Sequence, residues 1–112
     1  MAMFRAGVAP INIELMRYGP SQRPVEQRKC FICTNEIESE CHVLTQCPLY
    51  GDIRESLFYK LASHVTHFND MTDQKKMCVI LGNNEFTRIN AKTCYEILEC
   101  RKNAIYVCLF LL

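Results

Sequence analysis

Residues 30–47 read CFICTNEIESECHVLTQC and hold a dense cluster of metal-ligating side chains. Cys30 and Cys33 are separated by two residues, a spacing that lets a tight turn place both thiolates on one side of a tetrahedral ion. His42 and Cys47 complete a C-x2-C-x8-H-x4-C pattern. Four nitrogen and sulfur ligands fill the shell of zinc and leave no position for a reactive water. The spacing therefore predicts one structural Zn²⁺ ion.

The identity of the fourth ligand is left open by the sequence. Cys41 adjoins His42 and competes with it, but we favour His42 because its H-x4-C spacing to Cys47 recurs in zinc knuckles. Cys47 also precedes Pro48 at an expected helix N-terminus, where the helix dipole favours a thiolate. The segment has few large apolar side chains, so we expect metal binding to supply its folding free energy. The competing interpretation is a set of ordinary buried side chains.

Composition points to one soluble domain. The chain has 112 residues, of which 49% are hydrophobic and 22% charged, with a formal net charge of +1. It has eight cysteines, but the first residues contain no apolar signal region, so we expect reduced thiols in an intracellular protein. The apolar run 104–112 is too short to span a membrane. Nucleus and cytoplasm are not distinguished.

Apolar periodicity predicts three helices after the cysteine cluster. The first begins at Pro48 and buries a stripe that repeats every four residues: Leu49, Ile53, Leu57 and Leu61. The second is capped by Thr72 or Asp73 and ends at Gly82. The third runs from Thr87 to the end of the chain. Its expected inner face is Cys94, Ile97, Leu98, Ile105, Cys108 and Leu112.

These elements predict a mostly α fold, a small zinc knuckle packed against about three helices. Alternation over residues 11–15 favours a short extended stretch before it. The predicted organisation is a basic irregular lead-in (1–29), the knuckle with the start of the next helix (30–58), and a helical remainder (59–112). Together they form one domain.

The last six residues, 107–112, are apolar on all sides of the expected helix. Either a protein partner covers them, or the chain is a truncated reading frame. A protein partner at the C-terminal helix is thus one of two alternatives that stay open, and the sequence does not identify that partner or the oligomeric state.

The stretch from Cys30 to Leu57 resembles the zinc-binding domain that follows the polymerase region in non-LTR retrotransposon reverse transcriptases. That family shows a C-x2-C pair, a Glu-Thr-like dipeptide four residues ahead of a His, then H-x4-C-P and an amphipathic helix. Here the corresponding residues are Cys30, Cys33, Glu38-Ser39, His42, Cys47-Pro48, and the helix with Tyr50, Ile53 and Leu57. The motif covers about a quarter of the chain.

The resemblance implies a detached accessory module from a retroelement or a domesticated copy. In the family this module is thought to help the enzyme engage template RNA or target DNA. No Asp-Asp pair of a polymerase and no endonuclease motif is present in the sequence. We therefore expect a non-enzymatic protein. The alternatives are a protein-interaction module and a relic reading frame without a selected function.

Nucleic-acid contact is expected on the flanks of the cysteine cluster, because the segment that follows Cys30 is acidic. Weak, sequence-independent binding of RNA or DNA is assigned to four basic residues of the lead-in: Arg17, Arg23, Arg28 and Lys29.

Other chemistry-bearing residues are interpreted as structural. His64 and His67 lack a nearby third ligand for a second metal. Four cysteines of the helical remainder are expected to be small buried hydrophobes: Cys78, Cys94, Cys100 and Cys108. Two basic pairs, Lys75-Lys76 and Arg101-Lys102, are interpreted as solvated helix faces.

Overall fold

The computed structural model describes residues 1–7, 9–20, 22–82 and 85–110, and within them the fold is helical. The helices are α1 (Ala2–Ala6), α2 (Asn12–Leu15), α3 (Glu40–Thr45), α4 (Gly51–Ala62), α5 (Asp73–Leu81) and α6 (Thr87–Phe110). Three short 3-10 turns join them: η1 (Val25–Gln27), η2 (Pro48–Tyr50) and η3 (Phe68–Asp70). Among the described residues, extended pairing is limited to one antiparallel bridge, between Lys29 and Ile37.

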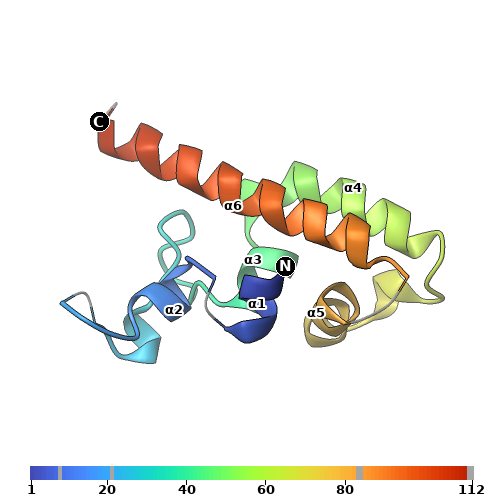
Figure 1. Ribbon diagram of the computed structural model, residues 1–112, viewed down its shortest axis with the longest axis horizontal. Helices are drawn as coiled ribbons and strands as arrows, with labels where there is room; N and C mark the ends of the chain where they lie inside the picture. Colours follow the sequence, from blue (N-terminus) through green and yellow to red (C-terminus); the bar gives the residue numbers. More distant parts are fainter. Residues whose placement is uncertain (8, 21, 83–84, 111–112) are drawn as a thin grey trace.

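Helix α6 runs along the length of the molecule, and the other elements pack beneath or beside it (Figure 1). Helix α4 packs against α6 and against η3, and α5 packs against both α6 and α3. The N-terminal segment and residues 30–47, called here the knuckle, lie under the C-terminal half of α6 (Figure 1). The last turns of α6 extend past the end of α4. The predicted mostly α architecture, with a cysteine and histidine cluster against helices, is confirmed.

The three helices predicted after the knuckle are present. Helix α4 buries Leu57 and Leu61, and Leu49 and Ile53 of the predicted stripe pack against this core. Helix α5 is capped by Thr72, whose hydroxyl accepts a hydrogen bond from the Lys75 amide at 3.3 Å.

The predicted inner face of α6 is confirmed for its first three residues and is wrong at Ile105. Cys94 and Ile97 are buried, and Leu98 packs against the core. Ile105 lines a surface groove instead of the core. Cys108 and Leu112 lie outside the residues whose side chains are described, as does most of the apolar run 107–112.

The extended stretch predicted over residues 11–15 is wrong, because these residues form the single turn of α2. Tertiary contacts override the alternating pattern. The Asn12 amide donates to a Glu38 carboxylate oxygen at 2.5 Å, and the Ile13 amide donates to the Glu38 carbonyl at 3.0 Å. Ile11, at the start of the turn, is fully buried. Contact with the knuckle therefore fixes the conformation of this segment.

Arg101 was predicted to be solvated, and this is wrong: it is 7% exposed and pairs with Glu38, which is 0% exposed. The guanidinium donates from Nε to Oε2 at 2.9 Å and from Nη2 to Oε1 at 2.7 Å. It also donates to the Asn12 side-chain oxygen at 3.2 Å. This bidentate pair joins α6, the knuckle and the N-terminal segment in one network.

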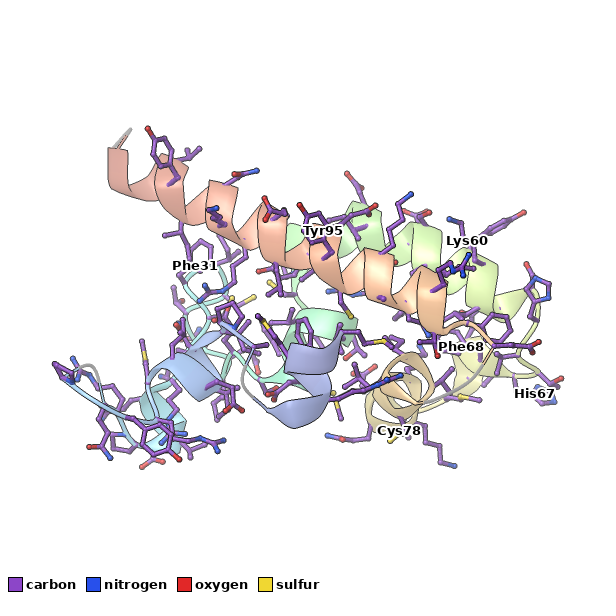
Figure 2. All side chains as sticks on the ribbon, viewed as in Figure 1. Phe31, Lys60, His67, Phe68, Cys78 and Tyr95 are labelled. Carbon is purple, nitrogen blue, oxygen red and sulfur yellow. The ribbon has the colours of Figure 1, made fainter. Side chains whose placement is uncertain are left out.

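The prediction of buried cysteines fails at Cys78, which is exposed on α5 (Figure 2). Cys94 is buried as predicted, and Cys100 is partly buried. Lys76, the second residue of the other basic pair, is half-buried, with its ammonium over the rings of Phe58 and Phe68. None of the described helices combines the length and hydropathy that crossing a bilayer requires.

Candidate metal centre

The first half of the knuckle is a tight turn that directs two cysteines to one point. The Thr34 amide donates to the Cys30 carbonyl at 2.9 Å, and the Cys30 amide donates to the Glu36 carbonyl at 2.8 Å. Thr34 has a φ of 56°, a left-handed conformation that closes the turn. Cys30 is buried and Cys33 is half-buried.

The second half of the knuckle is α3, which presents His42 from its first turn. The Ser39 hydroxyl caps this helix by accepting from the His42 amide at 3.1 Å. The helix ends at Thr45, and the chain then turns so that Cys47 lies back beside His42, with its amide on the His42 carbonyl at 2.8 Å. The cap and the turn together fix the spacing of these two side chains.

The four predicted ligands converge in space, although they come from two separate pieces of backbone. One donor atom from each of Cys30, Cys33, His42 and Cys47 lies within 4.8 Å of the other three. The sulfurs of Cys30 and Cys47 are 3.7 Å apart. Two thiolates at tetrahedral positions around zinc are separated by about 3.8 Å, given a Zn–S bond of about 2.3 Å. The arrangement therefore has the dimensions of a tetrahedral zinc shell.

The imidazole of His42 is oriented for metal binding through Nε2. Its Nδ1 lies 3.4 Å from the Gln46 side-chain oxygen, and the Gln46 amide nitrogen donates to Asp73 at 3.0 Å. Nε2 is buried and has no hydrogen-bond partner among the described residues. A buried nitrogen without a partner is costly, and a metal ion at this point would satisfy it. The sequence analysis did not predict a role for Gln46 or Asp73 beside the metal centre, although a His and a Gln four residues apart share a helix face.

Burial raises the pKa of two ligand thiols, Cys33 and Cys47. Burial raises the pKa of Cys47 to about 12, outweighing the Leu49 amide that hydrogen-bonds the sulfur and lowers it. Burial and the neighbouring Cys30 sulfur raise the pKa of Cys33 as well. The helix N-terminus after Cys47 therefore does not produce a thiolate by itself. Metal binding has to displace protons from these sulfurs.

Arg54 holds the end of the knuckle to α4. Its guanidinium donates to the carbonyls of Val43 and Leu44 at 3.1 Å and to the carbonyl of Cys47 at 2.8 Å. Val43 and Leu44 belong to the last turn of α3, and Cys47 lies two residues beyond its end, so these carbonyls lack partners within the helix. Burial lowers the pKa of Arg54 from its ordinary value.

The competing ligand Cys41 points elsewhere. Its sulfur lies 3.5 Å from the Thr45 hydroxyl, and it is absent from the cluster of four donors. His64 and His67 also lie apart: the His64 ring is 5.6 Å from that of Phe86, and His67 pairs with Asp70 at 3.7 Å. Within the described ranges, a single group of three or more metal-ligating side chains forms, the one in the knuckle.

The four basic residues assigned to nucleic-acid contact do not form one uniform surface. Arg17 pairs with Glu14 at 3.2 Å. Arg28 is half-buried and donates to the carbonyls of Arg23 at 2.8 Å and Ile13 at 3.1 Å, so that its guanidinium supports the loop. Arg23 and Lys29 are exposed.

The site can hold one ion in a closed shell of three sulfurs and one nitrogen, a donor set that zinc prefers. The sequence predicted all four donors. It missed the residues around them that fix their positions, of which Gln46, Arg54 and the pair Glu38–Arg101 are the clearest. Comparisons of the chain with protein-family models, with curated proteins and with solved structures found no match.

Proposed function

We propose that this chain is a structural zinc-binding module with no catalytic activity. One observation carries the proposal: the convergence of Cys30, Cys33, His42 and Cys47 within 4.8 Å. Three thiolates and one imidazole complete a tetrahedral shell, and a closed shell gives neither a reactive water nor a site for substrate. The ion then acts by fixing the shape of the knuckle.

Zinc content of the purified protein tests this proposal. Elemental analysis should find one equivalent of zinc in the parent chain and a loss of that equivalent in Cys30→Ser and in His42→Ala. Two matched controls separate a site effect from a general effect of losing a thiol. Cys41→Ser, next to the site, and the exposed Cys78→Ser should retain the zinc. Zinc lost in Cys41→Ser and kept in His42→Ala would instead assign the fourth ligand to Cys41.

We further propose that the module derives from a retroelement reverse transcriptase. What supports this is the match of the ligand pattern to the family and the position of Glu38 and Ser39. These two residues stand where the family has its Glu-Thr-like dipeptide. Glu38 is buried against Arg101, and Ser39 caps the helix that carries His42. Both residues therefore have structural reasons to accompany the zinc ligands.

The proposed activity of the module is weak, sequence-independent contact with RNA or DNA through the lead-in. The support is the basic character of Arg17, Arg23 and Lys29, which are exposed outside the acidic knuckle. Arg28 belongs to the same set, but the loop depends on its hydrogen bonds. A test of phosphate contact should therefore leave it in place.

Salt dependence of RNA binding tests the contact. Each phosphate contact adds about 0.7 to the slope of log affinity against log salt for a single strand. The triple variant Arg17→Ala/Arg23→Ala/Lys29→Ala should therefore bind more weakly, with a slope lower by about 2. A matched triple variant on the opposite end of the molecule, Lys60→Ala/Arg88→Ala/Lys92→Ala, should bind as the parent does. Parent protein whose binding does not change with salt would refute the proposal.

A further inference from the structure

The most distinctive surface outside the metal centre lies on the C-terminal half of α6. Four residues spaced by four, three and four positions share one side of this helix: Tyr95, Glu99, Lys102 and Tyr106. We call them the tyrosine face. Both tyrosines are large and exposed, Tyr95 by 65% and Tyr106 by 63%. The side of α6 that carries Cys94 and Ile97 is buried, and the tyrosine face lies beside it, with Glu99 half-buried and Lys102 exposed.

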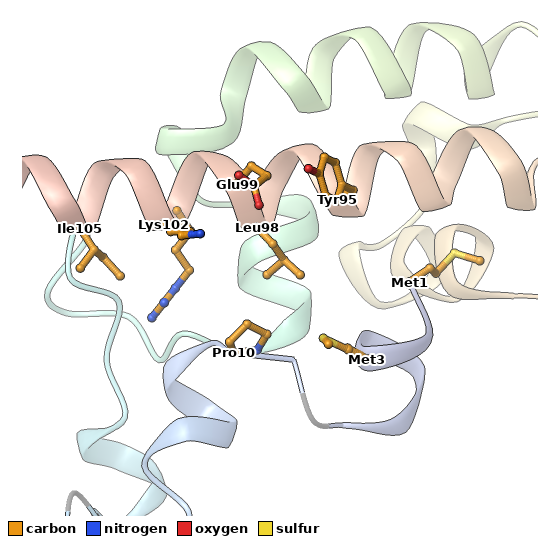
Figure 3. Close-up of a pocket in the computed structure, with 9 residues that line it drawn as sticks. Met1, Met3, Pro10, Tyr95, Leu98, Glu99, Lys102 and Ile105 are labelled. Carbon is orange, nitrogen blue, oxygen red and sulfur yellow. The ribbon is translucent and has the colours of Figure 1, made fainter.

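A groove runs beside the tyrosine face and gives it an apolar neighbour (Figure 3). Leu98 and Ile105 of α6 line one side, and Met1, Met3 and Pro10 of the N-terminal segment line the other. The groove is also lined by Arg101 and by three residues of the tyrosine face: Tyr95, Glu99 and Lys102. The groove has a volume of about 600 Å³ and is open to solvent along α6. Apolar grooves next to exposed aromatic side chains are typical of protein interfaces.

The order of residues on the tyrosine face reads the same in both directions. An aromatic, a charge, a charge and an aromatic follow one another, and the two charges have opposite signs. Both the tyrosine pair and the Glu99–Lys102 pair are centred on the peptide bond between Cys100 and Arg101. A two-fold axis at this bond places each tyrosine opposite the other tyrosine of a second helix. The same axis places each Glu99 opposite a Lys102.

We propose that α6 is a self-association surface, on which a second copy of this chain binds with its α6 antiparallel. Two-fold symmetry requires a surface complementary to itself, and the order of aromatic and charged residues on the tyrosine face has that property. Each tyrosine packs against the opposite tyrosine of the second copy, beside the groove, and the two Glu–Lys pairs fix the register. The charges favour a second copy over an unrelated partner, because an antiparallel α6 of the same chain offers a Lys102 to each Glu99 and a Glu99 to each Lys102.

The dimer is expected to be weak. A single pair of helices buries less than the standard interface of about 1,600 Å². Sedimentation velocity of the zinc-loaded full-length chain, from low micromolar to millimolar concentration, should show a reversible monomer–dimer equilibrium. A parent chain that stays monomeric over this range would overturn the proposal and leave the surface to a different partner.

Charge reversal separates this dimer from unspecific apolar association. Glu99→Lys places lysines opposite lysines, and Lys102→Glu places glutamates opposite glutamates. Each variant alone should raise the dissociation constant at least about tenfold. An equimolar mixture of the two variants should restore association, because every contact between unlike copies is then an attractive pair. The exposed Tyr59→Glu on α4 serves as the control and should sediment as the parent does.

Circular dichroism should show equal helix content in all these chains, so that a change in sedimentation reports association. Single variants that dimerise like the parent, or a mixture that gains nothing, would contradict the antiparallel arrangement. None of these outcomes depends on the zinc ligands or on the nucleic-acid contact. Failure here is therefore distinguishable from failure of the proposed function.

Discussion

The knuckle and the helical body α4–α6 reach a fixed conformation by different means. The body buries large apolar side chains, among them Leu57, Leu61, Phe68, Ile80 and Ile97. The knuckle buries only Val43 and Leu44 as large apolar side chains, and beside them it buries cysteine sulfurs, an imidazole and the Glu38 carboxylate that pairs with Arg101. Burial is nondirectional and tolerates small changes, whereas coordination and bidentate hydrogen bonds need particular atoms in particular places. The two regions should therefore respond differently to the same perturbation.

Metal removal should have the largest effect and should act on one region alone. Structural zinc contributes about 10–16 kcal/mol in small zinc domains, so a chelator or Cys47→Ser should unfold the knuckle. Helices α4 and α5 also pack directly against α6, so the body should keep its helices. Amide hydrogen exchange measures this difference: residues 30–47 should lose protection while α4 and α6 retain it. Cys78→Ser is the control, and a knuckle that stays protected without metal would show that packing alone holds it.

Breaking the ion pair between the regions should come next. Arg101→Leu leaves the Glu38 carboxylate buried without its partner and should cost about 3–5 kcal/mol in the free energy of unfolding. The double variant Glu38→Leu/Arg101→Leu should recover part of this loss, because no charge is left buried. It should not recover all of it, because the Asn12 amide then lacks its acceptor.

Urea unfolding of the zinc-loaded protein measures both variants, with the exposed Lys92→Ala as the control. A double variant no more stable than Arg101→Leu would mean that the loss comes from packing and not from the unpaired charge.

A smaller effect is expected from the residue that orients the metal-binding imidazole. Gln46→Ala removes the acceptor beside Nδ1 of His42 and should lower zinc affinity by about 10- to 100-fold. Competition with a chelating dye measures the affinity, and the exposed Gln74→Ala on α5 is the control. The helical body should keep its stability in both variants. Unchanged affinity in Gln46→Ala would mean that the imidazole is held by packing.

The smallest effect should be confined to the body. Thr72→Ala removes the hydroxyl that caps α5 and should cost about 1 kcal/mol of stability. Zinc affinity should not change, because the cap lies outside the hydrogen bonds that reach His42. The exposed Thr66→Ala is the control. Urea unfolding and dye competition measure the stability and the zinc affinity of both variants. A loss of zinc affinity in Thr72→Ala would show that the knuckle and α5 do not respond as separate regions.

The metal ligands could be predicted from the sequence because their geometry is local. Cys30 and Cys33 are set by one turn, and His42 and Cys47 by one short helix, so spacing alone specifies how each pair can point. The helices α4, α5 and α6 could likewise be predicted, because an apolar period and a cap are properties of neighbouring residues.

The contacts between regions could not be predicted in this way. Glu38 and Arg101 are separated by 63 positions, and nothing in the residues around Arg101 distinguishes it from an exposed basic side chain. The prediction of an extended stretch over residues 11–15 failed for the same reason, because the conformation of α2 depends on contacts with the distant Glu38. Cys78 was mistaken for a buried residue because aliphatic neighbours in sequence do not define which side of a short helix faces the core.

The Arg54 guanidinium links the metal centre to helix α4 through hydrogen bonds. It donates a hydrogen bond to the carbonyl of Cys47, a predicted metal ligand, and the backbone of Arg54 belongs to α4. A rotation of α4 about its axis would consequently displace the backbone of a metal-ligand residue as well as the apolar contacts of Leu57 and Leu61. Lysine at this position offers a single nitrogen and lacks the planar fork that reaches several carbonyls at once. The hydrogen bonds of Arg54 thus connect the metal shell to α4, so that we expect the coordination geometry and the tilt of α4 to change together.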